Sequence, residues 1–298
     1  MPDYESLLAR YDGQCQVVHR RGRHFPAAVV TEPTSRLQGG QWHVQAAPVQ
    51  PDADLIGAGA AHLAAVRAAA PSMFDGAVAA FTGWRPDGRL VVGAGSYFDM
   101  IATCDALRAE FQGAGPGTAL VFREAVERLA SGRPLEVGGG RVAAVGVSMA
   151  VTILGEGGGR QVLLGRRSNT VALDAGQVHL VPSGMTELHQ NPIETARREF
   201  TEELGVALPD GAQLVELGVG WDLLRLRPEI CLWLDLTGAD ELVSAVIDSC
   251  GGGEFGYLWL ADVGRTSLDT LWAALPPEVM APAAAAALAL LERTLDEQ

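Results

Sequence analysis

Short apolar runs separated by turn residues occupy the first part of the chain and predict β-strands. They cover residues 15–19, 26–30 and 41–49, and then a hairpin at 76–84 and 89–95 whose strands are joined by a Pro-Asp-Gly turn. Helical patterns lie between and after these runs, at residues 53–70, 97–111 and 118–131. The pattern predicts a self-contained α+β unit over residues 1–135.

A stretch rich in glycine and proline at residues 131–141 separates this unit from a second pattern. The second pattern predicts strands at 142–154, 160–167, 177–184, 212–220, 229–238 and 256–263, with helices at 192–204, 239–249 and 279–295. The strands surround the helices and do not alternate strictly with them. We therefore predict an α/β/α sandwich with a mixed sheet over residues 140–298, preceded by a smaller α+β N-terminal domain over 1–135.

The composition limits the class of protein. Of the 298 residues, 48% are hydrophobic, which is enough for a large core, and the net charge is −14 without any long basic run. This charge argues against nucleic acid or an anionic membrane as the main partner. No stretch reaches the roughly 20 apolar residues of a membrane span, and the first ten residues lack the order of a signal peptide. We expect a cytoplasmic protein with reduced cysteines.

All 22 basic residues are arginine, because the sequence contains no lysine. A P-loop requires a lysine for the β- and γ-phosphates, and pyridoxal and class I aldolase chemistry require a lysine amine. The sequence therefore excludes these three mechanisms.

The helix predicted at residues 192–204 has unusually clear ends. Asn191 is placed to cap the free amides, and Pro192 fits the first helical position, where no backbone donor is needed. Glu194 is placed to complete a capping box, and Gly205 suits the left-handed residue that ends a helix.

The same helix has three glutamates on one face. Glu199, Glu202 and Glu203 stand at i, i+3 and i+4, so their carboxylates converge within one turn. Sharing a divalent cation such as Mg²⁺ or Mn²⁺ would relieve their repulsion. The alternative from the helix alone is a solvated acidic surface, steadied by Arg197 and Arg198.

The spacing around this helix resembles the Nudix box, G-x5-E-x7-R-E-U-x-E-E-x-G-U, in which U is a bulky apolar residue. The matching segment runs from Gly184 to Val206 and agrees at eight of the nine specified positions. The departure is Gln190, where the family usually has glutamate. The chain is thus similar to the Nudix hydrolase superfamily over this segment.

The resemblance implies a fold and an activity. Nudix hydrolases cleave the diphosphate of a nucleoside diphosphate linked to another group, with Mg²⁺ held against the diphosphate; Mn²⁺ is the expected substitute. By this resemblance Glu199, Glu202 and Glu203 bind the metal, and Arg198, Glu202 and Glu203 are catalytic. Gly184 lets the loop backbone approach the substrate. The residue that activates water stays open, because family members draw it from different places.

Residues outside the specified box positions are further candidates for substrate binding. Glu187 lies in the loop before the helix, and it is either a ligand or a solvated turn residue. Glu229 and Glu254 are candidates for an additional carboxylate, and Arg166, with its neighbour Arg167, for a phosphate contact; the alternative for each is exposure to solvent. His179 is expected to be structural, whereas His189 in the loop is a candidate for contact with the substrate.

Two classes of function remain open. The first is an Mg²⁺-dependent pyrophosphohydrolase acting on a small nucleotide-type diphosphate. The second is a catalytically weak Nudix-like sensor that binds a nucleotide and regulates a partner, which the glutamine at position 190 favours. The N-terminal domain has no resemblance that we can name; completing the pocket, setting specificity or forming a homodimer are its open roles.

Overall fold

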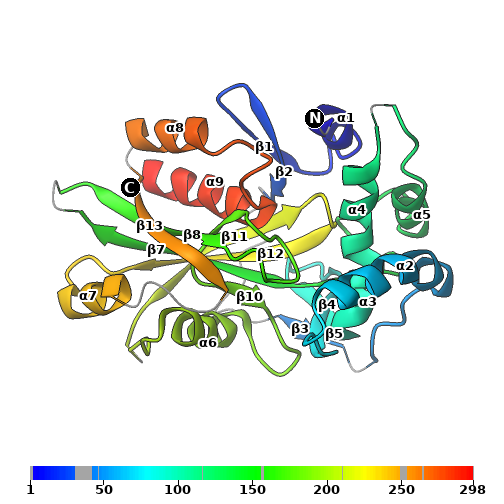
Figure 1. Cartoon of the computed structure of the whole chain (residues 1–298), viewed down its shortest axis with the longest axis horizontal. Coiled ribbons are helices and arrows are strands. Elements are labelled where there is room, and N and C mark those ends of the chain that lie inside the picture. The colour runs from blue at the N-terminus through cyan, green and yellow to red at the C-terminus, as the bar shows by residue number, and fades with distance from the viewer. Residues whose placement is uncertain are drawn as a thin grey trace.

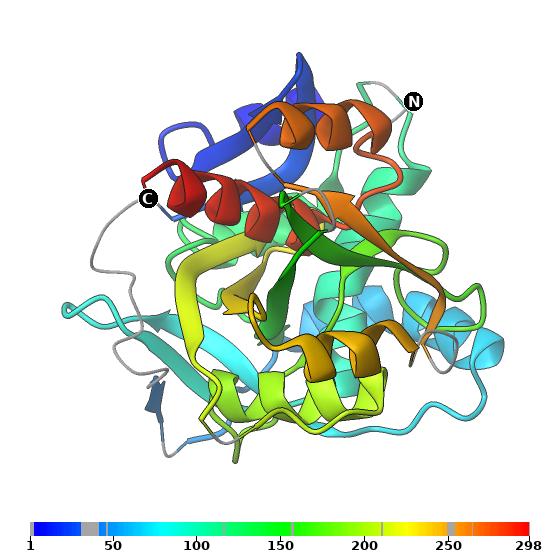
Figure 2. The same cartoon turned by 90° about the vertical axis from the view of Figure 1, so that its left-hand side faces the viewer.

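A nine-stranded mixed sheet lies between two layers of helices in the computed structural model, with α8 and α9 on one face and α6 and α7 on the other (Figure 1 and Figure 2). The structure describes residues 3–30, 42–45, 47–115, 117–155, 158–209, 211–248, 254–263 and 265–297. The layers confirm the predicted α/β/α sandwich, and a small α+β part from the N-terminal half lies beside it.

The large sheet has the order β1-β2-β11-β12-β7-β8-β13, with β10 paired to β7 and β9 paired to β8. Its strands are β1 (Gln16–Arg20), β2 (Arg23–Val29), β7 (Gly146–Leu154), β8 (Arg160–Arg167), β9 (Val178–Leu180), β10 (Ser183–Met185), β11 (Leu214–Asp222), β12 (Arg227–Asp235) and β13 (Phe255–Asp262). The central pair β12 and β7 is parallel and the other pairs are antiparallel, so the sheet is mixed as predicted.

The helices that cover the large sheet are α6 (Pro192–Leu204), α7 (Asp240–Asp248), α8 (Arg265–Ala274) and α9 (Pro282–Asp296). The alanine-rich start of α9 is buried and allows close packing, since a Cβ added at Gly220 of β11 would lie 2.5 Å from the Cβ of Ala286. In the described part of the chain, no helix is both long and apolar enough to cross a membrane.

The N-terminal part has a second sheet of the order β3-β5-β4-β6. Its elements are α1 (Tyr4–Ala9), β3 (His43–Val44), α2 (Ala53–Ala69), β4 (Ala77–Trp84), β5 (Leu90–Ser96), α3 (Tyr97–Met100), the π-helical turn η3 (Ile101–Asp105), α4 (Ala106–Gly113), α5 (Val121–Leu129) and β6 (Ala143–Ala144).

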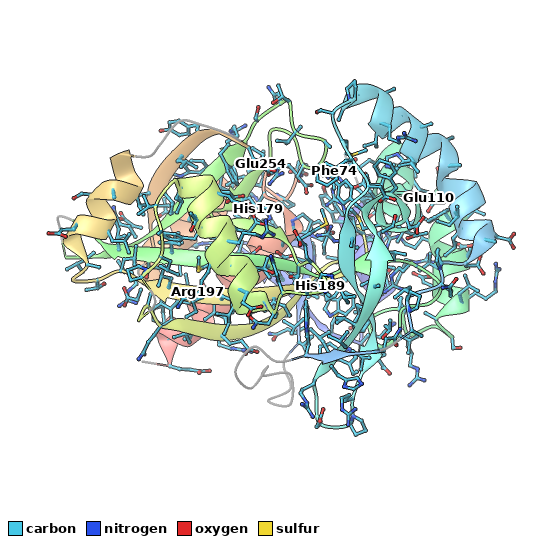
Figure 3. The ribbon with its side chains drawn as sticks, turned by 90° about the horizontal axis from the view of Figure 1, so that it is seen from below. Phe74, Glu110, His179, His189, Arg197 and Glu254 are labelled. Atoms are coloured by element: carbon cyan, nitrogen blue, oxygen red, sulfur yellow. The ribbon has the colours of Figure 1, made fainter. Side chains whose placement is uncertain are left out.

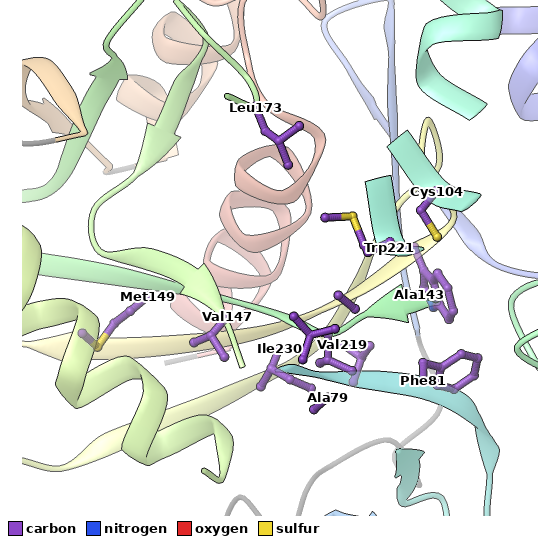
Figure 4. Close-up of a cluster of buried hydrophobic side chains, with 14 of the residues drawn as sticks. Ala79, Phe81, Cys104, Ala143, Val147, Met149, Leu173, Val219, Trp221 and Ile230 are labelled. Atoms are coloured by element: carbon purple, nitrogen blue, oxygen red, sulfur yellow. The ribbon is translucent and has the colours of Figure 1, made fainter. Parts of the chain in front are cut away.

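Two strand pairings connect the N-terminal half and the second half of the chain. The hairpin β1–β2 adds to the large sheet, because β2 pairs antiparallel with the end of β11, and β6 from the start of the second half pairs with β4 in the small sheet. One hydrophobic core extends across both, with the rings of Phe81 and Trp221 in an edge contact at 5.3 Å between centroids (Figure 4). The predicted domain boundary between residues 135 and 140 stays a prediction.

Several elements differ from the sequence-based expectation. The strand predicted at 177–184 is two strands with different partners, and Pro182 between them has no N–H to donate to either ladder. The strand predicted at 41–49 is reduced to two residues, and positions 41 and 46 lie outside the described residues. Helices α1 and α8 were not predicted. The connection between the strands predicted at 142–154 and 160–167 includes positions 156 and 157, which also lie outside the described residues.

Candidate active site

Helix α6 begins and ends where its sequence predicts. The side chain of Asn191 accepts a hydrogen bond from the backbone of Glu194, and the Glu194 carboxylate accepts one from the backbone of Asn191, which completes the capping box. Gly205 ends the helix in the left-handed region at φ 66°. These local contacts fix the bounds of the helix and therefore the positions of its acidic residues.

Two of the three glutamates, Glu199 and Glu203, turn toward β10. The Glu199 carboxylate lies so close to Gly184 that a Cβ there would be 2.0 Å from its Oε1, so only glycine fits. The backbone N–H of Ser183 donates to Glu203 Oε2 at 3.1 Å, while Oε1 is buried without a hydrogen-bond partner among the described residues.

Burial raises the pKa of both carboxyl groups. Desolvation is the main cause at Glu199, whose pKa rises to about 7 although Arg198 opposes the shift. Desolvation and the nearby Glu199 hold the pKa of Glu203 well above its ordinary value. Repulsion from Glu254 also raises the pKa of both groups.

Arg198 connects the third glutamate to this pair. Its guanidinium donates to Glu199 Oε1 and to Glu202 Oε2, each at 2.8 Å, and its Nε donates to Gln190 Oε1 at 3.2 Å. The Glu202 side chain is 56% exposed and lies on the flank of the helix. Arg198 therefore orients two of the predicted metal ligands, and Gln190 holds Arg198 through its amide oxygen.

A cavity of about 380 Å³ opens beside these residues. The candidates from the sequence that line it are Gly184, Glu199, Glu229, Glu254, Arg167 and His179. Arg198, Glu202 and Glu203 do not belong to the lining that the described residues form. The arginine at the end of β8 that lines it is Arg167, and Arg166 is exposed. Successive strand residues point to opposite faces, so the two neighbours cannot both reach one site. Glu187 is exposed, in agreement with the solvated alternative, and does not belong to the lining that the described residues form.

Glu254 and Arg167 form an ion pair at the cavity. Arg167 Nη2 donates to Glu254 Oε2 at 2.7 Å, and the backbone of Ser168 donates to the Glu254 carbonyl at 2.7 Å. Glu254 and His179, both labelled in Figure 3, line the same cavity. The Glu254 side chain is 56% exposed, so its carboxylate is accessible to a ligand as well as to Arg167.

Glu229 is buried, so exposure, the simpler expectation, is wrong for this residue. Its carboxylate lies over Gly146 of β7, where an added Cβ would be 1.9 Å from Oε2, and it accepts a hydrogen bond from Ser148 Oγ. Burial raises the pKa of Glu229 to about 7, against the opposing effect of Arg227. The strand is paired on both sides, which encloses this acid.

Other cavity residues were missed from the sequence. Arg225 is 3% exposed and binds three carboxylates: Asp105 Oδ1 at 2.6 Å, Asp222 Oδ2 at 2.8 Å and Asp174 Oδ1 at 3.0 Å. Asp105 comes from η3 and the other two from the second half, so this cluster links the halves at the edge of the cavity. Asp222 is three residues from Arg225, but Asp174 and Asp105 precede Arg225 by 51 and 120 residues, so these two contacts gave no local signal.

His179 also lines the cavity and has a structural environment, as expected. It is buried, and its Nδ1 lies 3.1 Å from the Leu180 carbonyl oxygen. Desolvation is the main cause that lowers its pKa to about 4, and Arg167 adds to the effect. The ring is neutral at pH 7. His189, in contrast, is exposed.

The donor set around Glu199 and Glu203 fits a divalent cation. Glu199 and Glu203 are neighbouring, largely enclosed carboxylates with raised pKa values. Arg198 pairs with Glu199, but Glu203 Oε1 has no hydrogen-bond partner in the described structure, so a further positive charge would stabilise the ionised pair. The described residues hold no group of three or more acidic, histidine or cysteine side chains already gathered as a metal site. Glu202 is the member that is turned away, toward Arg198.

Comparison with known protein families gives one match. The model of the NUDIX domain matches residues 145–237, a segment that contains β7 to β12 and the whole of α6. No curated protein sequence matches the chain.

Solved structures resemble part of the chain at low identity. A Nudix hydrolase from M. smegmatis, RenU, is 17% identical, with a TM-score of 0.33, and the match covers 52% of this chain and 88% of RenU. The NUDIX domain of Shewanella oneidensis NrtR, complexed with ADP ribose, is 15% identical, with a TM-score of 0.36 and coverage of 52% and 90%. The MutT protein from Methanosarcina mazei is 21% identical, with a TM-score of 0.31 and coverage of 52% and 94%.

Proposed function

We propose that this chain, a Nudix superfamily member through its domain at residues 145–237, hydrolyses a diphosphate bond in a substrate linked to a nucleoside diphosphate. Mg²⁺ is the proposed cofactor, and Mn²⁺ is the proposed substitute. The observation that carries the proposal is the pair Glu199 and Glu203, two largely enclosed carboxylates against β10, of which Glu199 lines the cavity.

Glu199, Glu203 and Glu202 would hold the metal. When bound, the cation supplies positive charge against the phosphoryl oxygens and polarises water. Arg198 fixes the carboxylates of Glu199 and Glu202 by direct hydrogen bonds, which keeps both oriented before substrate arrives. Gly184 leaves room for the Glu199 carboxylate next to the backbone of β10.

The remaining cavity residues fit the handling of a charged substrate. Arg167 is placed to neutralise a phosphoryl group, because its guanidinium lines the cavity and its present partner, Glu254, is half exposed. Water attacks phosphorus and passes a proton to a carboxylate of the cluster formed by Glu199, Glu203 and Glu254. The leaving phosphate departs with the bridging oxygen.

The test is hydrolysis of a panel of nucleoside diphosphate derivatives with Mg²⁺. The panel contains nucleotide sugars, dinucleotides and oxidised nucleoside triphosphates, and products are measured by chromatography. We expect Glu203→Gln to lower kcat by about 10²-fold or more. Glu194→Gln on the same helix is the matched control, because glutamine also completes a capping box. Equal activity of Glu203→Gln and the wild type would refute the proposal.

A nucleotide sensor without turnover is the second candidate function. It is favoured by Gln190, which replaces a carboxylate of the usual box. The same panel distinguishes the two: a sensor would show ligand-dependent thermal stabilisation and no product with any compound.

A further inference from the structure

The cavity at the Nudix site has a second wall, which the N-terminal half provides. Ala70, Ser72 and Met73 from the segment after α2, and Tyr97 from the start of α3, line it together with Glu199 and Arg167. The family match begins at residue 145, so none of these four residues belongs to the matched domain. The composition of the wall is therefore a property of this chain.

The second wall is held as one unit. The carboxylate of Asp75 accepts hydrogen bonds from Ser96 Oγ at 2.8 Å and from the backbone of Phe98 at 2.9 Å. The backbone of Tyr97 donates to the Gly76 carbonyl at 2.8 Å. These three contacts fix the loop that carries Met73 to the first turn of the helix that carries Tyr97.

The two walls differ in chemistry. The Nudix side presents the glutamates and the guanidinium groups of Arg167 and Arg227. Arg227 Nε is buried and has no hydrogen-bond partner within the described structure, and Arg227 Nη1 contacts the sulfur atoms of Met100 and Met185 at 3.8 and 3.6 Å. A guanidinium donor without an acceptor favours an anionic group of a ligand. The N-terminal wall instead offers a thioether and a phenol ring, with no ionised group among its four residues.

Acids on the N-terminal side do not change this division. Asp105 forms an ion pair with Arg225 at 2.6 Å, its other carboxylate oxygen lies 2.8 Å from His62 Nε2, and it does not belong to the lining that the described residues form. Tyr97 is the one phenol, phenyl or indole ring among the described residues that line the cavity. Its pKa is raised mainly by burial, and Arg227 opposes the shift while Glu254 adds to it. An uncharged ring can therefore lie on Tyr97 while an attached diphosphate reaches the arginines and glutamates.

We propose that Met73 and Tyr97 form the subsite for the nucleobase of the substrate, so that the N-terminal half selects the substrate while the Nudix half cleaves it. Aromatic and thioether side chains bind flat heterocycles by stacking and by S–aromatic contact. This inference rests on the proposed function only for the diphosphate to which the base is attached. The cavity volume of about 380 Å³ is within the usual range for small-molecule sites.

Phe74 does not belong to the cavity lining that the described residues form, but it is the exposed neighbour of Met73. It follows Met73 directly, is 79% exposed, and lies on the side of the N-terminal part that faces Glu254 in Figure 3. A phenylalanine this exposed gains by covering a bound ring. We assign it to the outer edge of the base subsite.

Calorimetric binding tests the subsite without requiring turnover. The probes are ADP, GDP, CDP and UDP, with inorganic pyrophosphate as the ligand that has no base, all with Mg²⁺ and the full chain. We expect Tyr97→Ala and Met73→Ala to raise the Kd of the preferred nucleoside diphosphate roughly tenfold, and Phe74→Ala to raise it about threefold. The Kd of pyrophosphate should change less than about twofold, because that ligand does not reach the second wall.

Two further variants keep the result interpretable. Tyr97→Phe retains the ring and should restore binding, which separates stacking from loss of structure. Val121→Ala, at a residue that is 69% exposed on α5, is the control for removing exposed apolar surface and should bind like the wild type.

Equal loss of affinity for pyrophosphate and nucleoside diphosphates would overturn the subsite, as would wild-type protein that binds no base more tightly than pyrophosphate. The failure of the proposed function looks different. If the second-wall variants weaken only the nucleoside diphosphates but Glu203→Gln does not alter hydrolysis, the subsite stands and the assigned catalytic chemistry is wrong.

Discussion

At the scale of single residues, Gln190 departs from the Nudix box but occupies a structural role within it. Its Oε1 accepts hydrogen bonds from Arg198 Nε and Thr195 Oγ1, both at 3.2 Å. An amide oxygen serves here as well as a carboxylate oxygen would, because the task is to hold the guanidinium. The position is therefore linked to the metal ligands through Arg198.

This role gives a prediction with opposite outcomes for two substitutions. Gln190→Glu keeps the acceptor, and we expect kcat/KM and its Mg²⁺ dependence to stay within about threefold of the wild type. Gln190→Leu removes the acceptor and leaves a half-buried donor unpaired, which should lower kcat/KM roughly tenfold. Steady-state kinetics over a Mg²⁺ titration measure both. A Mg²⁺ requirement strongly altered by Gln190→Glu would mean that position 190 itself contacts the metal.

His179 gives a prediction on stability and pH. Its pKa is lowered from 6.5 to about 4 by burial, so the folded state favours the neutral ring. The stability from this effect is fully present above pH 6.5 and is lost as the pH falls toward 4, by at most about 3 kcal/mol. Glu199 and Glu229, with pKa values raised to about 7, act in the opposite direction over the same pH range.

Because these effects oppose each other, the pH dependence of the wild type alone does not isolate the effect of His179. The unfolding free energy of a His179 variant must therefore be compared with that of the wild type at each pH. We expect the difference in unfolding free energy between His179→Gln and the wild type to shift in favour of the variant as the pH falls from 7 to 4.5. Urea unfolding at several pH values measures it. His189→Gln, at an exposed histidine, should leave the pH dependence unchanged; parallel curves for the wild type and His179→Gln would contradict the assignment.

At the scale of elements, the sequence predicted what depends on local contacts. The bounds of α6 follow from Asn191, Pro192 and Gly205, which act within one or two turns, and the inward pair Glu199 and Glu203 follows from i, i+4 spacing. Helix α8 gave a weak local signal, because serine, threonine and aspartate favour helix interiors poorly. Its buried Leu268, Leu271 and Trp272 show that tertiary packing decides this element.

The part of the site that the sequence did not predict depends on pairing between distant segments. Arg225 follows no motif, and it binds Asp105 of η3 and Asp174 of the loop before β9, which only the fold brings near it. Met73 and Tyr97 lie in a region without a recognisable family. Burial of Glu229 follows from the place of β12 between β11 and β7, which strand periodicity alone does not determine.

At the scale of the whole molecule, charged and apolar contacts join the two halves. Arg225 from the second half binds Asp105 from the first, and buried Arg123 of α5 donates to the carbonyl groups of Leu223 and Leu224. Removing one partner from such a buried group typically costs 3–5 kcal/mol. The loop between β11 and β12, which carries Arg225 to the cavity, is thus supported by the N-terminal half.

These contacts lead to a prediction for residues 140–298 expressed alone. That fragment retains the predicted Nudix domain but loses β2, so the end of β11 becomes an open sheet edge, and it loses Phe25, whose ring contacts Trp272 at 5.0 Å between centroids. It also uncovers Trp221, which is fully buried in the whole chain. We expect the fragment to melt about 10 °C or more below the whole chain, or to aggregate, with red-shifted tryptophan emission.

The matched experiment adds the missing half in trans. Co-expression of residues 1–135 with 140–298 should restore the tryptophan emission and the melting temperature, because β2, Asp105 and Arg123 return with the first fragment. A fragment 140–298 that melts and hydrolyses substrate like the whole chain would instead show that the boundary near residues 135–140 separates independent domains. In that case the pairing of β2 with β11 would contribute little to the stability of the large sheet, and the substrate cavity would function with a single wall.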